Sequence, residues 1–307
     1  MTQVAVIGGS GFIGSHLVRR LASTGSRVHA LGLTQGGGDA ASQADERVQW
    51  FRGDFRDDAL MRSVMEGADT VFHLVSTTLP RSSNDDPVFD ITSNVGGTLN
   101  LLRTAVECRV RKVVFLSSGG TVYGPPKFLP ISEDHPLEPN CSYGVSKLAI
   151  EKYLHLFQAQ HGLDYAVVRL SNPFGAGQPL DRAQGAVSIF LDHILREEPI
   201  EIWGDGSVVR DYVYISDAVE GIVAAAAHEG GQRIYNIGSG VGHSLNEVIA
   251  EIEEVSGKRA NVTYKPARVF DVPVNVLSIA RAQQELGYAP RVSFREGIRQ
   301  TLDWLRG

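Results

Sequence analysis

The sequence predicts an α/β protein, with a Rossmann-type, doubly wound parallel sheet followed by a smaller α/β region. Three observations lead to this prediction. Short β-branched runs alternate with helical patterns up to Leu170, a glycine-rich turn directly follows the first of these runs, and the alternation stops in a loop-rich stretch at residues 172–184. Strands that alternate with helices form parallel sheets with helices on both faces.

The elements of the expected sheet follow one another along the chain. Strands are predicted at residues 3–7, 27–31, 48–51, 70–75, 113–116 and 164–170. Helices are predicted at residues 14–23, 57–65, 94–108 and 142–160, because apolar residues recur there at helical spacing. The last of these helices is expected to bury a face that carries Val145, Leu148, Ala149, Leu156 and Phe157.

Beyond this sheet, short strands are predicted at residues 200–203, 209–214 and 233–237. Two capping boxes, Ser244 with Glu247 and Ser293 with Glu296, indicate the starts of two helices. Gly257 is expected to end the first of these helices in a left-handed conformation.

The change of pattern after Leu170 divides the chain into two regions. We expect one domain over residues 1–170, which a segment near residues 209–237 rejoins. A second, cap-like region is expected over most of residues 171–307.

Composition and charge exclude several classes of function. The chain has 307 residues, a net charge of −6 at pH 7 and two cysteines. An acidic protein is poorly suited to bind nucleic-acid polymers or anionic membranes, and no apolar run reaches the roughly 18 residues of a membrane helix. No signal peptide is recognisable, and two lone cysteines are typical of a reducing compartment. We therefore predict a cytoplasmic protein and, from the histidine spacing, no metal site.

The glycine-rich turn has the spacing GxxGxxG, with a strand before it and a helix after it. Glycines in this place allow a tight turn and a close approach of the backbone to a diphosphate, which the helix N-terminus then faces. The context predicts dinucleotide binding. The residues expected to contact the cofactor here are Gly8, Ser10, Gly11, Phe12, Ile13 and Gly14.

The end of the second strand bears on the choice of cofactor. Rossmann folds that bind NAD carry an acid there, which binds the adenosine ribose, but in this chain Gly32 takes that place. Because no carboxylate would repel a 2′-phosphate, Gly32 favours NADP(H) over NAD(H), although no arginine stands next to it in the sequence. Asp54, followed by Phe55, could bind the adenine amino group; the alternative is an ordinary turn aspartate.

Tyr143 and Lys147 are four residues apart at the start of the long helix, so both side chains should lie on one face. An ammonium beside a phenol is expected to lower the pKa of that phenol. Such a phenol can exchange a proton with a sugar oxygen while hydride moves to or from a nicotinamide. The alternative is a simple surface pair at i, i+4.

Together, these motifs resemble an extended short-chain dehydrogenase/reductase of the nucleotide-sugar, NAD(P)-dependent epimerase/dehydratase family, similar to UDP-glucose 4-epimerase. The matching stretches are GGSGFIGSH at the start, GDFRD at 53–57, VFHLVS at 71–76, SNVGGTLNLL at 93–102, SSGGTVYG at 117–124, YGVSK at 143–147, RLSNPFGAGQ at 169–178 and WGDGSVVRDYVYISD at 203–217. They span nearly the whole chain. The resemblance implies an NAD(P)-binding domain over 1–170, a substrate-binding region mostly over 171–307, a nucleoside-diphosphate sugar as substrate and a homodimer formed by the helices at 94–108 and 142–160.

The resemblance also implies roles for single residues. Tyr143 would be the acid/base, and Lys147 would support it and bind the nicotinamide ribose. Further cofactor contacts would come from Leu74, Val75, Asn94, Ser117 and Ser118. Asn172 would contact the diphosphate or sugar of the substrate, and Arg210 would pair with a diphosphate oxygen. A local ion pair between Arg210 and Asp211 is the alternative.

The sequence departs from the family pattern at the end of the fifth strand. Gly119 stands where relatives carry a serine or threonine that binds the reacting sugar oxygen, and Gly120 and Thr121 replace the Asp-Glu pair of dehydratases. Dehydration is therefore disfavoured. Thr121 or Ser118 could supply the missing hydroxyl, and the two glycines would let a sugar approach the backbone closely.

Three functions remain open. The leading hypothesis is an NADPH-dependent 4-ketoreductase of nucleoside-diphosphate 4-keto-(6-deoxy)hexoses, because a reductase exchanges its cofactor and does not need a strong ribose clamp. The alternative is a nucleoside-diphosphate-sugar 4-epimerase of the UDP-glucose or UDP-GlcNAc type. A hypothesis of another class is a non-catalytic NAD(P)-sensing protein, against which the intact pair of Tyr143 and Lys147 counts.

Overall fold

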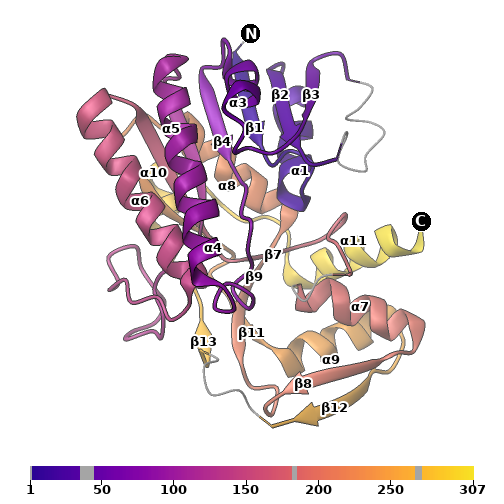
Figure 1. Cartoon of the computed structure of the whole chain (residues 1–307). Coiled ribbons are helices and arrows are strands. Elements are labelled where there is room, and N and C mark those ends of the chain that lie inside the picture. Colours follow the sequence, from indigo (N-terminus) through magenta and orange to yellow (C-terminus); the bar gives the residue numbers. More distant parts are fainter. Residues whose placement is uncertain (1, 35–44, 182–184, 267–271) are drawn as a thin grey trace.

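The computed structural model describes residues 2–34, 45–181, 185–266 and 272–307 (Figure 1). Its main feature is a seven-stranded sheet with the order β10-β6-β5-β4-β1-β2-β3, in which every pair is parallel. The strands are β1 (Gln3–Ile7), β2 (Arg27–Gly32), β3 (Val48–Arg52), β4 (Thr70–His73), β5 (Lys112–Ser118), β6 (Asp164–Leu170) and β10 (Ile234–Ile237). The predicted fold class is confirmed.

Helices cover both faces of this sheet and bury two separate apolar cores. One core contains side chains of α1 (Phe12–Ser23) and α8 (Ile215–Ala227). The other contains side chains of α3 (Asp58–Met65), α5 (Gly97–Glu107) and α6 (Ser142–His161). Figure 1 shows α5 and α6 side by side in front of the sheet.

The helix predicted at residues 94–108 is interrupted at its start. A short helix α4 (Pro87–Ile91) leads into a π-helical turn η2 (Thr92–Gly96), and α5 begins only after it. Polar side chains in this segment bond back to the preceding turn: Thr92 Oγ1 donates to the Val88 carbonyl and Asn94 Nδ2 to the Asp90 carbonyl. Such bonds compete with the regular ladder, which favours a wider turn at this point.

The second region carries two small sheets. In the first, β9 (Val209–Tyr214) pairs with β7 (Asn172–Phe174), β11 (Gly242–Ser244) and β13 (Val274–Asn275). In the second, β8 (Pro199–Trp203) pairs with β12 (Asn261–Lys265). The helices are α7 (Ala186–Arg196), α9 (Leu245–Ser256), α10 (Ala280–Leu286) and α11 (Phe294–Arg306). Figure 1 shows β8, β12, α7 and α9 below the large sheet.

The segment at 209–237 is divided between the two regions. Its last strand, β10, extends the large sheet beside β6, and α8 packs on that sheet, whereas β9 is the centre of the first small sheet. The chain therefore crosses to the large sheet between β9 and α8, and it returns after β10, since the next strand, β11, pairs with β9. Residues of β6 and β9 consequently border a common cavity.

The helix ends in the second region follow the local sequence. Ser244 and Glu247 form a complete capping box at the start of α9, and Gly257 ends that helix with φ of 71°. Ser293 Oγ accepts a hydrogen bond from the Glu296 backbone N–H at the start of α11. In the described part of the chain, no helix combines the length and apolar character that crossing a membrane requires.

The buried face of α6 differs from the predicted one. Val145 and Leu156 were expected to face the core but are 47% and 41% exposed. The helix instead buries Ser146, Lys147 and Glu151 beside its apolar residues. Side-chain hydrogen bonds and an ion pair satisfy these polar groups, which removes most of the usual penalty for burying them.

Candidate active site

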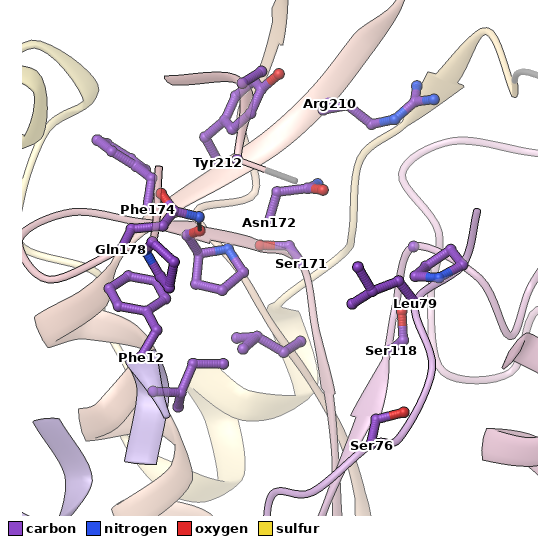
Figure 2. Close-up of a pocket in the computed structure, with 18 of the residues that line it drawn as sticks. Phe12, Ser76, Leu79, Ser118, Ser171, Asn172, Phe174, Gln178, Arg210 and Tyr212 are labelled. Atoms are coloured by element: carbon purple, nitrogen blue, oxygen red, sulfur yellow. Dashed lines mark hydrogen bonds between the residues drawn. The ribbon is translucent and has the colours of Figure 1, made fainter. Parts of the chain in front are cut away.

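A cavity of about 910 Å³ lies between the ends of the parallel strands and the second region. Its wall combines the glycine-rich turn, the end of β5, the start of α6 and residues of β7, β8 and β9. In the close-up of Figure 2, Asn172 and Ser171 lie in the middle, Phe12 and Gln178 on one side, and Ser76 and Ser118 on the other. Ligands of open α/β sheets bind at this edge.

The glycine-rich turn is built for close backbone contact. Gly8 has φ of 96°, and a Cβ atom on Gly14 would lie 2.0 Å from the Gly8 carbonyl oxygen, so only glycine fits at position 14. No described side chain caps the N-terminus of α1, whose first residues line the cavity. Free N–H groups at a helix start attract a phosphate. The turn therefore fits the diphosphate of a dinucleotide.

The cavity brings together most of the predicted site residues but not all. Those that line it are Gly8, Ser10, Gly11, Phe12, Ile13, Gly14, Leu74, Ser117, Ser118, Gly120, Thr121, Tyr143, Lys147, Asn172 and Arg210. Those outside its lining are Gly32, Asp54, Phe55, Val75, Asn94 and Gly119.

Three of the outlying residues have partners elsewhere in the structure. The Asp54 carboxylate is paired with Arg56 at 2.5 Å, and Phe55 is buried in the core. A Val75 methyl group lies 3.1 Å from the position that a Cβ on Gly8 would take, so it packs beneath the turn. Val75 therefore supports the glycine-rich turn directly, whereas the Asp54 side chain is 40% exposed in its pair with Arg56.

Tyr143 and Lys147 lie on one face of α6, as their spacing predicted. Lys147 is buried, and its Nζ donates to the Leu116 carbonyl at 2.8 Å and lies 5.4 Å from the centre of the Tyr143 ring. Burial lowers the pKa of Lys147 to about 8, although the Glu151 and Asp90 carboxylates oppose this shift. The ammonium is therefore held close to its protonation midpoint at neutral to mildly basic pH.

The expected effect of Lys147 on Tyr143 is wrong. The pKa of Tyr143 is raised, first by burial and then by the nearby Cys141 and Asp90. A phenolate in this position loses most of its hydration, and an ammonium 5.4 Å from the ring centre does not compensate. The phenol is therefore protonated at neutral pH.

Gly119 was expected to lie beside the substrate, but it is outside the cavity lining. A Cβ on Gly119 would lie 2.5 Å from a Leu277 methyl group, so a side chain there would point away from the cavity. Thr121 Oγ1 is buried, lines the cavity and has no hydrogen-bond partner among the described residues. Its hydrogen-bonding capacity is therefore unused within the described cavity wall, as is that of the Ser171 Oγ directly after β6.

A buried carboxylate, Asp90, connects the start of α6 to the cavity wall. It accepts hydrogen bonds from Ser142 Oγ at 2.8 Å and Ser146 Oγ at 2.6 Å, on either side of Tyr143. It also accepts from Thr78 Oγ1 and from Asn94 Nδ2. The sequence did not indicate this residue, because it stands in the mixed run DPVFDITS without a recognisable motif.

Asn94 has a structural place in the same network. Its Oδ1 accepts from the Thr77 backbone N–H at 2.9 Å and from Ser76 Oγ at 3.3 Å. The side chain thereby fixes the loop whose residues Ser76 and Thr78 line the cavity. Asn94 shapes the wall from behind.

A second buried network lies one turn further along α6. Arg169 and Glu151, at 1% and 2% side-chain exposure, form an ion pair at 2.6 Å. Ser117 Oγ donates to Glu151 at 2.6 Å, and Arg169 also donates to the Tyr123 hydroxyl. Glu151 follows Lys147 by one helical turn, so it places a fixed negative charge near the ammonium.

Asn172 and Arg210 lie on the neighbouring strands β7 and β9 in the wall that the second region contributes. Asn172 Nδ2 donates to the Asp211 carbonyl at 3.0 Å, and Arg210 Nη1 donates to the Val272 carbonyl at 2.7 Å. The Asp211 carboxylate accepts from Ser239 and Gly240, so it does not form the alternative local pair with Arg210. Backbone carbonyls therefore hold the guanidinium in the cavity wall.

The second region also contributes lining residues that the sequence did not indicate. They are Gln178, Phe190, Glu201, Trp203 and Tyr212. Glu201 and Trp203 alternate with buried Ile200 and Ile202 along β8, a period-2 pattern that was visible but carried no chemical signal.

Comparison with known proteins identifies relatives along the whole chain. The model of the NAD dependent epimerase/dehydratase family matches residues 4–238. A UDP-glucose 4-epimerase of Mycolicibacterium smegmatis is 36% identical over 308 residues, with 99% of this chain and 98% of that protein covered. A dTDP-4-dehydro-6-deoxyglucose reductase of Escherichia coli is 32% identical over 309 residues, with 99% and 97% covered.

Solved structures show the same arrangement. The UDP-glucose 4-epimerase of Thermotoga maritima with UDP-glucose has a TM-score of 0.93 and 33% identity, covering 99% of each chain. The Thermus thermophilus UDP-glucose 4-epimerase in complex with NAD has a TM-score of 0.90 and 34% identity, covering 100% of this chain and 99% of that one.

Proposed function

The chain belongs to the NAD dependent epimerase/dehydratase family, and we propose that it transfers hydride at C4 of a nucleoside-diphosphate hexose, with Tyr143 as proton donor and acceptor. The observation that carries this proposal is the meeting of Tyr143, buried Lys147 and the unpartnered Thr121 hydroxyl in the cavity that the glycine-rich turn lines. When bound, NAD(P) supplies the hydride acceptor or donor.

The residues of this chain divide the remaining tasks. The protonated phenol of Tyr143 gives its proton to the C4 oxygen in reduction and takes one from the C4 hydroxyl in oxidation. Thr121 Oγ1 hydrogen-bonds the same sugar oxygen and fixes its direction. Lys147 holds positive charge beside the phenol, which stabilises the phenolate after proton donation. Asn172 and Arg210 bind the diphosphate from the second region.

Of the reactions open to such a site, we favour 4-ketoreduction of a nucleoside-diphosphate 4-keto-(6-deoxy)hexose with NADPH. Gly32 leaves the end of β2 without a carboxylate, so the adenosine ribose lacks the anionic clamp that retains NAD. The raised pKa of Tyr143 keeps the phenol in its protonated form, which is the form that reduction consumes. A relative from Escherichia coli is named as a 4-dehydro-sugar reductase.

A 4-epimerase is the second candidate. Several relatives over the full chain, including the one from Mycolicibacterium smegmatis, are named UDP-glucose 4-epimerase. Tyr143 and the Thr121 hydroxyl can serve both directions of hydride transfer. The site is therefore compatible with oxidation followed by reduction of the opposite sugar face.

The experiment offers nucleoside-diphosphate sugars and their 4-keto-6-deoxy derivatives to the purified protein with NADH or NADPH. A 4-ketoreductase consumes reduced cofactor in proportion to a 4-keto substrate, and NMR identifies the alcohol formed. Conversion of UDP-glucose to UDP-galactose without net cofactor consumption, by protein that retains NAD on purification, would instead establish the epimerase. No turnover of any sugar would contradict the proposal.

We also propose that a second copy of the chain covers the exposed apolar side chains of α4 and α6. These are Val88, Phe89, Ile91, Val145 and Leu156, which are 41–71% exposed. Clusters of exposed large apolar residues are typical of interfaces. Light scattering should give the mass of a dimer, and Val145→Glu should yield monomers, whereas Val241→Glu, an exposed position in the second region, should not. A monomeric wild-type protein would contradict this assembly.

A further inference from the structure

We propose that Arg52 and Ser10, together with the bare end of β2 at Gly32, form a binding site for the 2′-phosphate of NADP(H). This inference rests on the proposed function in one respect, which is that the glycine-rich turn binds a nicotinamide dinucleotide. It concerns residues at the edge of the parallel sheet, outside the catalytic wall.

The register of the sheet brings Arg52 to Gly32. Strands β2 and β3 are parallel, and Gly32 pairs with Arg52 although twenty residues separate them in sequence. Paired residues of neighbouring strands point to the same face of a sheet. The preceding pair on that face, Ala30 with Trp50, packs in the core that contains α1. Arg52 therefore leaves β3 on the side of the glycine-rich turn.

Ser10 fills the place where an acid would stand. A Cβ on Gly32 would lie 2.1 Å from Ser10 Oγ and 2.5 Å from Ser10 Cβ. A side chain at position 32 is therefore excluded while Ser10 keeps this position, and with it the carboxylate that selects NAD in Rossmann folds. A hydroxyl, which can donate to a phosphate oxygen, takes its place.

The charge of Arg52 is directed toward this point. Its Nε donates to the Leu33 carbonyl at 3.3 Å, which holds the guanidinium over the end of β2. Within the ranges that the structure describes, no ion pair involves Arg52, and the nearby Asp54 carboxylate is engaged with Arg56. A planar guanidinium with free N–H groups is the side chain best suited to a phosphate monoester.

These residues lie around the place that the 2′ position of the adenosine ribose takes in a Rossmann fold. The residue at the end of the second strand of a Rossmann fold faces the 2′ position of the adenosine ribose, where an acid binds the hydroxyl of NAD and an arginine accepts the phosphate of NADP. Here the acid is absent, and its space holds a hydroxyl donor. An arginine that has no carboxylate partner among the described residues reaches across from β3. The structure thus assigns the 2′-phosphate as the ligand of this edge.

The test measures binding without a sugar substrate. Calorimetry compares 2′,5′-ADP with 5′-AMP, and NADPH with NADH, for the wild-type protein, Arg52→Gln and Arg62→Gln. The control removes the same charge from α3, on the opposite face of the sheet, where Arg62 pairs with Glu107. We expect Arg52→Gln to lower the affinity for 2′,5′-ADP by about 10- to 100-fold, as for loss of a charged hydrogen bond. The affinity for 5′-AMP should stay unchanged.

The outcomes separate this inference from the proposed function. Equal affinity of the wild type for 2′,5′-ADP and 5′-AMP, or an equal loss of both in Arg52→Gln, would overturn the 2′-phosphate site and leave the sugar chemistry standing. Discrimination lost in Arg52→Gln alone supports the site even if every sugar in the panel fails. A wild type that binds none of the four nucleotides would overturn both.

A double variant tests the site in the other direction, by converting it to an NAD-type site. Ser10→Gly with Gly32→Asp relieves the contact with Ser10 Oγ and places a carboxylate at the end of β2. This double variant should bind NADH more tightly than NADPH. If it kept the wild-type preference for the 2′-phosphate, Arg52 and Ser10 would not be its determinants.

Discussion

On the sheet side of the cavity, Lys147 and Glu151 are 5% and 4% exposed and are held by side chains of neighbouring strands and helices. On the opposite side, Trp203 is 41% exposed, and the Arg210 guanidinium is held by two backbone carbonyls. The first wall is therefore preorganised, as proton transfer requires. In the second wall, an exposed side chain such as that of Trp203 can be replaced at little cost to the core, which would suit a wall that discriminates between sugars and nucleotides.

Removing the phenol tests the preorganised wall most strongly. Tyr143→Phe should lower turnover by about 10²–10⁴-fold, because proton transfer to the C4 oxygen loses its donor. Affinity for NAD(P) should remain, since the glycine-rich turn is unchanged. Steady-state kinetics and calorimetry measure the two effects.

Tyr153→Phe is the matched control for this variant. Tyr153 lies on the same helix, packs against the core and is outside the cavity lining. Full activity of Tyr143→Phe would remove the assigned proton donor, and a protein that still performed its cellular role without turnover would be the NAD(P)-sensing protein of the third hypothesis.

Breaking the buried ion pair of Arg169 and Glu151 behind this wall should lower the unfolding free energy of the protein. Glu151→Gln leaves the Arg169 guanidinium buried at 1% exposure without its carboxylate. Breaking such a pair costs about 3–5 kcal/mol of unfolding free energy. Denaturant titration measures this loss. Glu107→Gln is the control, because the exposed pair of Glu107 with Arg62 contributes less than about 1 kcal/mol. Similar losses in the two variants would argue against a rigid network behind Lys147.

Substitutions in the second wall, which carries Trp203 and Arg210, should change ligand affinity and leave the unfolding free energy unchanged. Arg210→Gln is expected to lower the affinity for a nucleoside diphosphate by about 10- to 100-fold, because charged hydrogen bonds are lost. Cofactor affinity and the unfolding midpoint should change little. Calorimetry with UDP and dTDP measures the effect, and Arg259→Gln, at a 90% exposed side chain of the same region, serves as control. Equal loss of NADPH affinity would show that Arg210 acts on the whole cavity.

What the sequence could predict follows the same division. The glycine-rich turn and the pair of Tyr143 and Lys147 were visible because their geometry is local, set by one turn and one helical spacing. The register of Gly32 with Arg52 was not, because it depends on pairing between strands twenty residues apart. For that reason the arginine missing from the sequence neighbourhood of Gly32 is present in its spatial neighbourhood.

The face of α6 shows a second limit. Apolar periodicity predicted that Val145 and Leu156 would be buried, but the hydrogen bonds of Ser146 and Glu151 determine the orientation of the helix. A polar residue is buried only if its partners are in place, and those partners, Asp90 and Arg169, lie on other elements. Periodicity in one helix contains no information about them.

The smallest predicted effect is a shift in pH dependence at Asp90. Its carboxylate raises the pKa of Lys147 against the larger lowering by burial, together with Glu151; the ammonium also faces the Phe115 and Tyr143 rings and the Leu116 carbonyl. Asp90→Asn removes one of the two supporting charges. The pKa of Lys147 should then fall below about 8, because its charged form loses stabilisation.

The direction of the effect on activity follows because the proposed mechanism uses the protonated, charged form of Lys147. Lys147 carries its proton below its pKa and loses it above, so the basic limb of the profile of kcat/KM against pH should move to lower pH in Asp90→Asn. Asp85→Asn removes an equal charge five residues away on the exposed surface and should leave the limb in place. A limb that moves equally in both variants would reflect net charge and not Asp90. An unchanged limb in Asp90→Asn would mean that the preorganised wall holds the lysine by geometry alone.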